Sequence, residues 1–133
     1  MDFPLNYSIQ KAGLPLIVTS SKPHLCFLVD SGSTQNIIFS YVLTALDEVN
    51  LNLTDTTTSI TGITGSVMES KQMEFGVTFG ETWYEATWSI VEAPQAIIQL
   101  QNETGLQVHG ILGVPFLTQN EWIIDFKNLT ITQ

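Results

Sequence analysis

The sequence contains no arginine and little positive charge of any kind. Its 133 residues include 4 lysines against 13 aspartates and glutamates, which gives a formal net charge of −9 at pH 7. A protein that binds nucleic acid or docks on anionic lipid needs a basic patch to neutralise phosphates. We therefore expect neither a nucleic-acid partner nor a membrane partner.

Thiol and imidazole groups are equally scarce. Cys26 is the only cysteine, so no disulfide can form within the chain. The two histidines, His24 and His109, lie far apart in the sequence and do not have the spacing of metal ligands. We expect no metal and no cofactor.

Long apolar runs are also lacking. No uncharged apolar run approaches the length of a membrane span, and the first residues, 1–4, do not resemble a signal peptide. Together with the single cysteine, this favours a cytoplasmic location. The length suits one domain over 1–133, with 1–12 as a candidate terminal arm, and a hydrophobic content of 44% is enough for a packed core.

Most of the chain has the pattern of short strands. Continuous or alternating apolar residues mark the segments 14–19, 25–29, 75–79, 84–90, 122–126 and 129–131. The residues at 80–82 predict a hairpin connection. Only two segments have a helical pattern: one follows Ser40, a suitable N-cap, and a very short one begins at Pro115. The predicted fold class is all-β with one or two short helices.

The most informative segment is 27–34, Phe-Leu-Val-Asp-Ser-Gly-Ser-Thr. The strand carries no polar side chain from Leu25 to Val29, which predicts burial on both faces and places the Asp30 carboxylate at the base of a cleft. Such a carboxylate needs hydrogen-bond donors, and the Gly32 and Ser33 amides and the Ser33 hydroxyl are close in the sequence. On this short pattern alone, an ordinary Asx-type turn is the more frequent explanation.

Two downstream elements give the segment a wider context. The residues at 61–66, Thr-Gly-Ile-Thr-Gly-Ser, have the glycines of a tight hairpin tip that a substrate backbone can approach closely. The residues at 108–113, Val-His-Gly-Ile-Leu-Gly, form an apolar strand that ends in glycine. In this order and spacing, the three elements resemble the retropepsin-type aspartic proteases of retroviruses, retrotransposons and some bacteria, over roughly residues 14–132.

The resemblance implies an acid-protease closed barrel with a flap hairpin, and an aspartic endopeptidase without a cofactor. In that family each chain supplies one catalytic aspartate, and two chains pair to complete the site. The resemblance gives Asp30 the catalytic role, Ser31, Gly32 and Ser33 a supporting role, Gly62, Ile63, Thr64 and Gly65 the flap, and Ile111, Leu112 and Gly113 the substrate pocket.

The chemistry of peptide hydrolysis explains the pairing. One carboxylate must accept a proton from water, and one carboxylic acid must polarise the scissile carbonyl. Two Asp30 side chains across a two-fold axis supply both, because carboxylates about 3 Å apart cannot both ionise and hold one proton between them. We therefore expect a homodimer that binds a peptide or protein substrate in an extended conformation.

Two positions depart from the family. Retroviral members carry an arginine after the late glycine, where this chain has Val114, so the retroviral style of dimer packing is not expected. Ser31 stands where threonine is commoner, but either hydroxyl can make the hydrogen bond between subunits.

Other interpretations of these residues remain open. Asp125 lacks a following Ser/Thr-Gly and precedes a turn, which favours a structural or exposed role over a catalytic one. Cys26 has the surroundings of a small buried hydrophobe, not of a nucleophile, and the two histidines have those of strand-surface residues. The segment 61–66 also fits an ordinary surface hairpin. The whole chain also fits a catalytically silent binding or assembly module on the protease fold.

Overall fold

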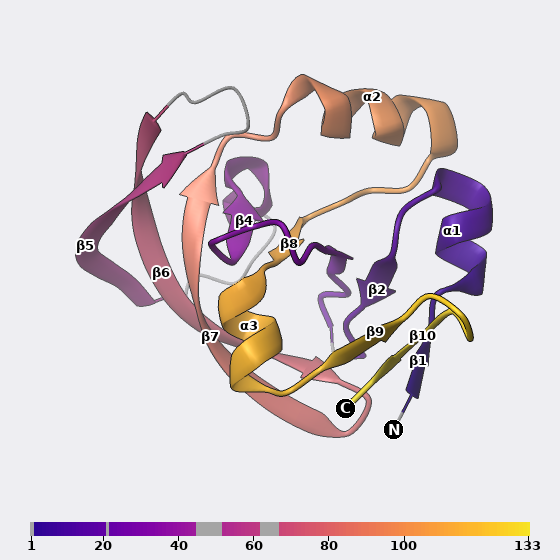
Figure 1. Cartoon of the computed structure of the whole chain (residues 1–133). Helices are drawn as coiled ribbons and strands as arrows, with labels where there is room; N and C mark the ends of the chain where they lie inside the picture. Colours follow the sequence, from indigo (N-terminus) through magenta and orange to yellow (C-terminus); the bar gives the residue numbers. More distant parts are fainter. Residues whose placement is uncertain (1, 21, 45–51, 62–66) are drawn as a thin grey trace.

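The strands of the protein form two sheets in a computed structural model that describes residues 2–20, 22–44, 52–61 and 67–133 (Figure 1). One sheet has three strands, in the order β1 (Asp2–Pro4), β10 (Thr130–Thr132) and β9 (Ile123–Asp125). The other has seven, in the order β2 (Leu16–Val18), β3 (Cys26–Val29), β8 (Gly110–Leu112), β4 (Ile37–Phe39), β7 (Thr82–Val91), β6 (Val67–Phe79) and β5 (Asn52–Thr61).

The predicted predominance of strands is confirmed, but the closed barrel is not present in the part of the chain that the structure describes. The seven-stranded sheet begins at β2 and ends at β5, and these two edge strands do not pair with each other. Closure requires every strand to hydrogen-bond on both sides. The protein is a small β-rich domain with two open sheets.

In the described residues, four short helices accompany the sheets: α1 (Asn6–Ala12), the 3-10 helix η1 (Ser40–Thr44), α2 (Gln95–Thr104) and α3 (Val114–Gln119). The predicted helices at Ser40 and Pro115 correspond to η1 and α3. The other two helices are not predicted, although each ends at a glycine in the left-handed conformation, Gly13 and Gly105. Within the described ranges, no helix is long and apolar enough to cross a membrane.

The two ends of the chain lie side by side (Figure 1). Within the candidate arm 1–12, β1 pairs with β10, and Phe3 lies opposite Ile131. The Leu5 amide donates to the Leu129 carbonyl at 2.8 Å, and the Leu5 side chain is fully buried. Residues 2–12 therefore contribute to the core.

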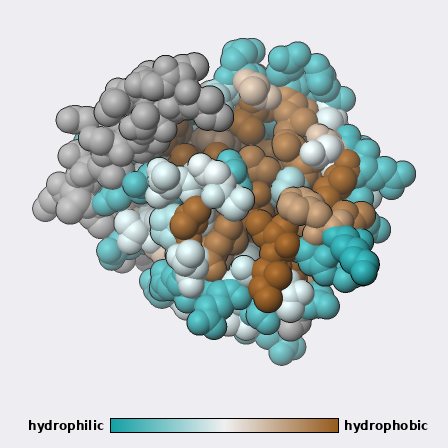
Figure 2. Space-filling model, in the orientation of Figure 1, coloured by the Kyte–Doolittle hydropathy of each residue, from teal (hydrophilic) through white to brown (hydrophobic). Residues whose placement is uncertain are grey.

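The segment that follows β8 exposes apolar side chains. Ile123 and Phe126 are 61% and 62% exposed, and Val114, the first residue of α3, is 38% exposed. On the face of the molecule that Figure 2 shows, apolar residues gather in the middle and hydrophilic residues lie around the edge. An exposed apolar area of this kind is typical of an interaction surface.

The long hairpin of β6 and β7 supplies one wall of the core. Phe75, Val77 and Phe79 are buried on β6, and Tyr84, Ala86 and Trp88 are buried on β7, while the residues that alternate with them are more exposed. This confirms the predicted period-2 pattern. The two strands are joined at Gly80, whose φ of 62° fits a tight turn.

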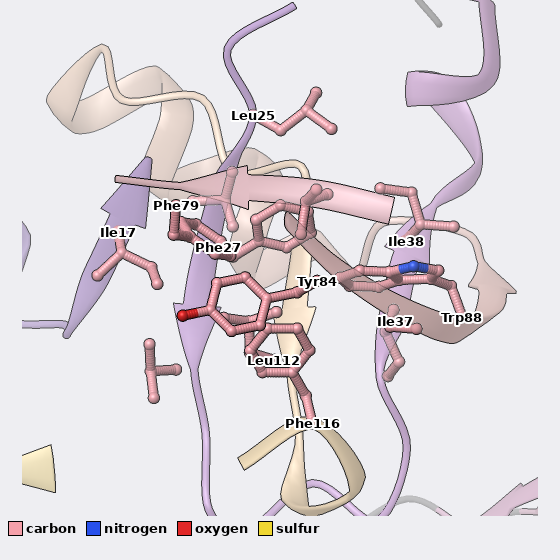
Figure 3. Close-up of a cluster of buried hydrophobic side chains, with 14 of the residues drawn as sticks. Ile17, Leu25, Phe27, Ile37, Ile38, Phe79, Tyr84, Trp88, Leu112 and Phe116 are labelled. Atoms are coloured by element: carbon pink, nitrogen blue, oxygen red, sulfur yellow. The ribbon is translucent and has the colours of Figure 1, made fainter. Parts of the chain in front are cut away.

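Aromatic side chains fill the space between this hairpin and β3 (Figure 3). The Trp88 ring is stacked on Phe27 and on Phe75, at centroid distances of 5.0 and 4.8 Å. The Trp88 Nε1 donates to the Phe75 carbonyl at 3.1 Å, so the buried indole N–H is satisfied. Phe116 of α3 packs edge-on against Phe79. β3 therefore rests on a rigid aromatic layer.

Gly110 is predicted to be indispensable for the packing of β8. A Cβ there would lie 2.2 Å from the Ile37 carbonyl oxygen and 2.9 Å from the Phe27 ring. Gly110→Ala should lower the free energy of unfolding by about 1–3 kcal/mol, because buried backbone must move to admit the methyl group. Urea denaturation measures the loss.

Gly76→Ala is the matched control. A Cβ at Gly76 would meet the Trp83 ring at 2.0 Å, but that side chain is 58% exposed and can rotate away. Neither glycine has a positive φ. A loss for Gly76→Ala as large as that for Gly110→Ala would show that backbone crowding at Gly110 is not the cause.

Candidate active site

The Asp30 turn lies where two parallel strands end side by side. β3 and β8 pair in parallel, with Val29 opposite Leu112. The Asp30 amide donates to the Leu112 carbonyl at 3.0 Å, so the ladder continues one step beyond β3. Parallel strands deliver their carboxyl ends to the same edge of a sheet, and Asp30 and Gly113 meet there.

Within the turn, the Asp30 carboxylate is partly exposed and is held by a backbone amide. Its Oδ1 accepts a hydrogen bond from the Gly32 amide at 2.8 Å. The Ser33 amide donates to the Asp30 carbonyl at 3.1 Å, and the Ser33 hydroxyl donates to the Gln35 carbonyl at 2.6 Å. Of the three expected donors, only the Gly32 amide reaches the carboxylate.

The second carboxylate oxygen of Asp30, Oδ2, differs from Oδ1 in its hydrogen bonding. Across the ranges that the structure describes, Oδ2 of Asp30 accepts no hydrogen bond from the protein. Ser31 and Gly32 are exposed beside it. Within the described part of the chain, the lone pairs of Oδ2 are therefore not used by a protein donor.

Gly113 lets the chain cross itself beside the aspartate. A Cβ on this residue would lie 2.2 Å from the Gln35 carbonyl oxygen and 2.8 Å from that of Ser33. The Val114 amide donates to the Ser33 carbonyl at 2.9 Å. The turn after Asp30 thus wraps over Gly113, and only a residue without a side chain fits beneath it.

Asn36 is a buried structural residue beside the Asp30 turn, and the sequence pattern assigned it no role. It is buried, and its Oδ1 accepts hydrogen bonds from the Gly113 and Phe116 amides, both at 3.1 Å. Its Nδ2 donates to the Thr87 carbonyl at 3.3 Å, and its own carbonyl accepts from the Ser89 amide at 2.7 Å. One side chain therefore joins the end of β8, the start of α3 and β7. The available signal was an amide placed directly before the apolar run at 37–39.

The expected burial of β3 on both faces is wrong. Phe27 and Val29 are buried against the aromatic core, but Cys26 and Leu28 are only half-buried. Side chains alternate along a strand, so Leu28 lies on the side of β3 where Asp30 follows. Leu28 is paired in register with Ile111, which is also half-buried. These two side chains form an apolar surface beside the aspartate.

The residues expected to line the substrate pocket therefore divide into two groups. Ile111 is partly exposed. Leu112 and Gly113 are buried, and Leu112 is among the core side chains of Figure 3. Leu112 contributes its carbonyl to the Asp30 turn, not a side chain to the surface. The continuous apolar run of β3 predicts burial for each of its residues, so Leu28 was not expected at the surface.

The residues expected to form the flap, Gly62, Ile63, Thr64 and Gly65, lie outside the described residues. The strands on either side are described: β5 and β6 pair antiparallel, with Thr61 opposite Val67 at the last pair.

Asp125 has a structural role, as predicted. Its Oδ1 accepts from the Lys127 and Asn128 amides at 2.9 and 3.0 Å, and its Oδ2 accepts from the Asn128 side chain at 2.7 Å. Hydrogen bonds from the Asn128 backbone and side chain hold the pKa of this exposed carboxyl below its usual value. Asp125 stabilises the turn between β9 and β10.

The thiol and the imidazoles do not form a metal site in the described part of the chain. No group of three or more potential ligands is present there. Burial raises the pKa of Cys26 to about 11, so the thiol stays protonated and is a poor nucleophile. His24 is exposed, and its Nδ1 lies 2.9 Å from the Thr19 carbonyl oxygen. His109 is half-buried beside β3.

Comparison with known proteins finds no matching family model and no matching curated protein. The function is therefore argued from the geometry of the Asp30 turn.

Asn36→Ala should destabilise the protein by about 2–4 kcal/mol. The substitution leaves the Gly113 and Phe116 amides buried without an acceptor, and each such amide costs about 1–3 kcal/mol. Urea denaturation gives the total, and hydrogen exchange at the two amides should accelerate with it.

Asn120→Ala is the control at the other end of α3. The Asn120 Nδ2 donates to the Phe116 carbonyl at 2.9 Å, and its side chain is only half-buried. Its loss should cost about 1 kcal/mol or less. Equal effects for the two asparagines would contradict the bridging role of Asn36.

Proposed function

We propose that the protein is an aspartic endopeptidase that acts as a homodimer. The observation that carries the proposal is the Asp30 carboxylate itself. It leaves the end of a core strand, is oriented by the Gly32 amide through Oδ1, and keeps Oδ2 open. The surrounding backbone is held in place by the close crossing at Gly113 and by the hydrogen bonds of Asn36. Such a rigid setting for one partly exposed carboxylate supports a catalytic role.

The reaction requires two copies of Asp30. One carboxylate accepts a proton from water as the water attacks the scissile carbonyl, and the other, protonated, donates a hydrogen bond to the carbonyl oxygen. Like charges at close range force the pair to hold one proton. The sequence holds one Asp-Ser-Gly, at residues 30–32, and Asp125 is engaged in its own turn. The proposed dimer therefore has two-fold symmetry, with Asp30 of each protomer at the axis.

The surface of the chain supports association with a second copy. β9 is an edge strand of the three-stranded sheet, and Ile123 on this strand is 61% exposed. Val114 is also exposed, immediately after the Gly113 crossing at the Asp30 turn. An edge strand offers unpaired backbone groups, and apolar side chains next to it favour burial against another chain.

The proposed substrate is an extended peptide that contains apolar residues around the scissile bond. Leu28 and Ile111 present the half-buried apolar surface on the side of β3 where Asp30 follows. An extended peptide aligns its backbone with such a site as an added strand, and pockets accept its alternate side chains. This chemistry favours hydrophobic side chains over charged ones.

Asp30→Asn should abolish peptide cleavage and leave the dimer intact. The amide cannot accept the proton of water, so the rate should fall by at least about 10²-fold. Asp125→Asn is the control: it removes a carboxylate from an exposed turn and should retain activity. Cleavage of a broad peptide library measures activity, and sedimentation measures the dimer.

The outcomes separate the enzyme from the alternative function. Activity that survives Asp30→Asn would exclude Asp30 as the catalytic group. A wild-type protein that is dimeric but cleaves no peptide in mildly acidic solution would be a binding or assembly module on the same fold.

The dimer should be weakest in neutral solution at low salt. Each chain carries −9, so the dimer carries twice that, −18, and its protomers repel one another. Raising the ionic strength screens the repulsion, and protonating carboxylates reduces it. Analytical ultracentrifugation should show a several-fold lower dissociation constant at high salt. A dissociation constant that rises with salt would mean that attraction between charges holds the dimer together.

A further inference from the structure

His109 lies at the point where the ladder between β3 and β8 begins. The first paired residues are Phe27 and Gly110, and one step earlier Cys26 lies beside His109. The His109 amide donates to the Cys26 carbonyl at 2.8 Å. In return, the Cys26 amide donates to Nδ1 of the His109 side chain, also at 2.8 Å. The imidazole thus takes the place of a main-chain acceptor.

This hydrogen bond requires a neutral imidazole. Nδ1 accepts an N–H only when it carries no proton, so the ring proton of His109 is on Nε2. An imidazolium has an N–H at both nitrogens and would point one of them at the Cys26 amide. Protonation therefore breaks the bond and leaves a partly buried amide without an acceptor. Burial also lowers the pKa of His109, which favours the same neutral form.

The other histidine has the opposite requirement. Nδ1 of His24 faces the Thr19 carbonyl oxygen at 2.9 Å, and a carbonyl can only accept. The proton of neutral His24 is therefore on Nδ1, and the charged ring keeps the same bond. Protonation of the two rings would therefore disturb the His109 contact and leave the His24 contact in place.

We propose that His109 is a proton-sensitive latch: its neutral imidazole adds a second hydrogen bond between β3 and the start of β8, and its protonated form loses that bond while the His109 amide stays bonded to the Cys26 carbonyl. The titratable groups next to it are the Cys26 thiol of β3 and the Tyr41 phenol of η1, whose ring centroid is 6.3 Å from that of His109. Both stay uncharged in neutral and acidic solution, because burial raises the pKa of each. His109 is the member of this cluster that changes charge.

The latch acts on the two strands that present the candidate active site. Asp30 lies four residues after Cys26, and Gly113 lies four residues after His109. Release of the latch loosens both strands at their far ends. The effect on cleavage rests on the proposed function. The proton shared by two Asp30 carboxylates favours cleavage in mildly acidic solution, and loss of the His109 latch sets the lowest pH at which cleavage continues. His109 is in this sense a positioning residue, because it reaches the carboxylate only through β3.

The pH window follows from the direction of the shift. The folded pKa of His109 is below the ordinary value of 6.5, so the unfolded chain binds a proton that the folded chain does not. The stabilisation is complete above about pH 6.5 and is lost as the pH falls through the folded pKa. Over this window the folding equilibrium constant decreases by up to about tenfold per pH unit.

The test compares wild type, His109→Asn and His24→Asn by urea denaturation between about pH 7 and pH 5. The Asn Oδ1 occupies the position of Nδ1 and accepts the Cys26 amide, but it cannot be protonated. His109→Asn should remove up to about tenfold of pH dependence per unit. His24→Asn is the control and should not flatten the slope, because the bond of His24 to the Thr19 carbonyl survives protonation. If His109→Asn keeps the wild-type slope, or flattens it no more than His24→Asn does, the latch does not exist.

Two further measurements use the wild-type protein. Nitrogen NMR should find the ring proton of neutral His109 on Nε2 and that of His24 on Nδ1, and a proton on Nδ1 of His109 would overturn the proposal. If peptide cleavage is found, its loss in acid should begin at a lower pH in His109→Asn than in wild type. If no cleavage is found, the proposed function fails, while the denaturation slopes still decide the latch.

Discussion

The parallel ladder between β3 and β8 is the constraint on which the candidate site depends. It brings Asp30 and Gly113, which are 83 positions apart in the sequence, to the same edge of one sheet. The ladder continues through the Asp30 amide to Leu112, so the carboxylate is held by sheet hydrogen bonds up to its own residue. The aromatic side chains around Trp88 pack closely against β3 and fix its position in the core.

Two features fix the backbone of the turn that follows this ladder. Gly113 has no room for a side chain beneath the Gln35 carbonyl, and Asn36 bonds with two amides on the crossing segment. Both are buried and leave the carboxylate partly exposed. The arrangement stabilises the backbone and leaves the carboxylate partly exposed, a division that suits the catalytic role proposed for Asp30.

Charge and protonation act at two separate ends of the same strands. At one end Asp30 is an acid whose proposed partner is a second copy of itself, in a chain that already carries −9. At the other end, the imidazole of His109 bonds with the Cys26 amide only in its neutral form. Mild acid favours the first arrangement and opposes the second, so the proposed catalysis and the stability of its scaffold set limits on opposite sides of the pH scale.

The amino-acid sequence alone determined the β-rich class and the two faces of the β6–β7 hairpin, because these follow from local periodicity. It also determined the start of η1 and α3 and the turn role of Asp125, because these follow from the chemistry of helix ends and turns. It also singled out Asp30 and its glycines as a candidate. Only the tertiary structure decided that Leu28 and Ile111 share one face and Leu112 does not reach it. The same holds for Asn36, which spans three elements, and for the open sheets. These depend on which strands distant in the sequence become neighbours, and the pattern within one strand shows which residues share a face without naming that neighbour.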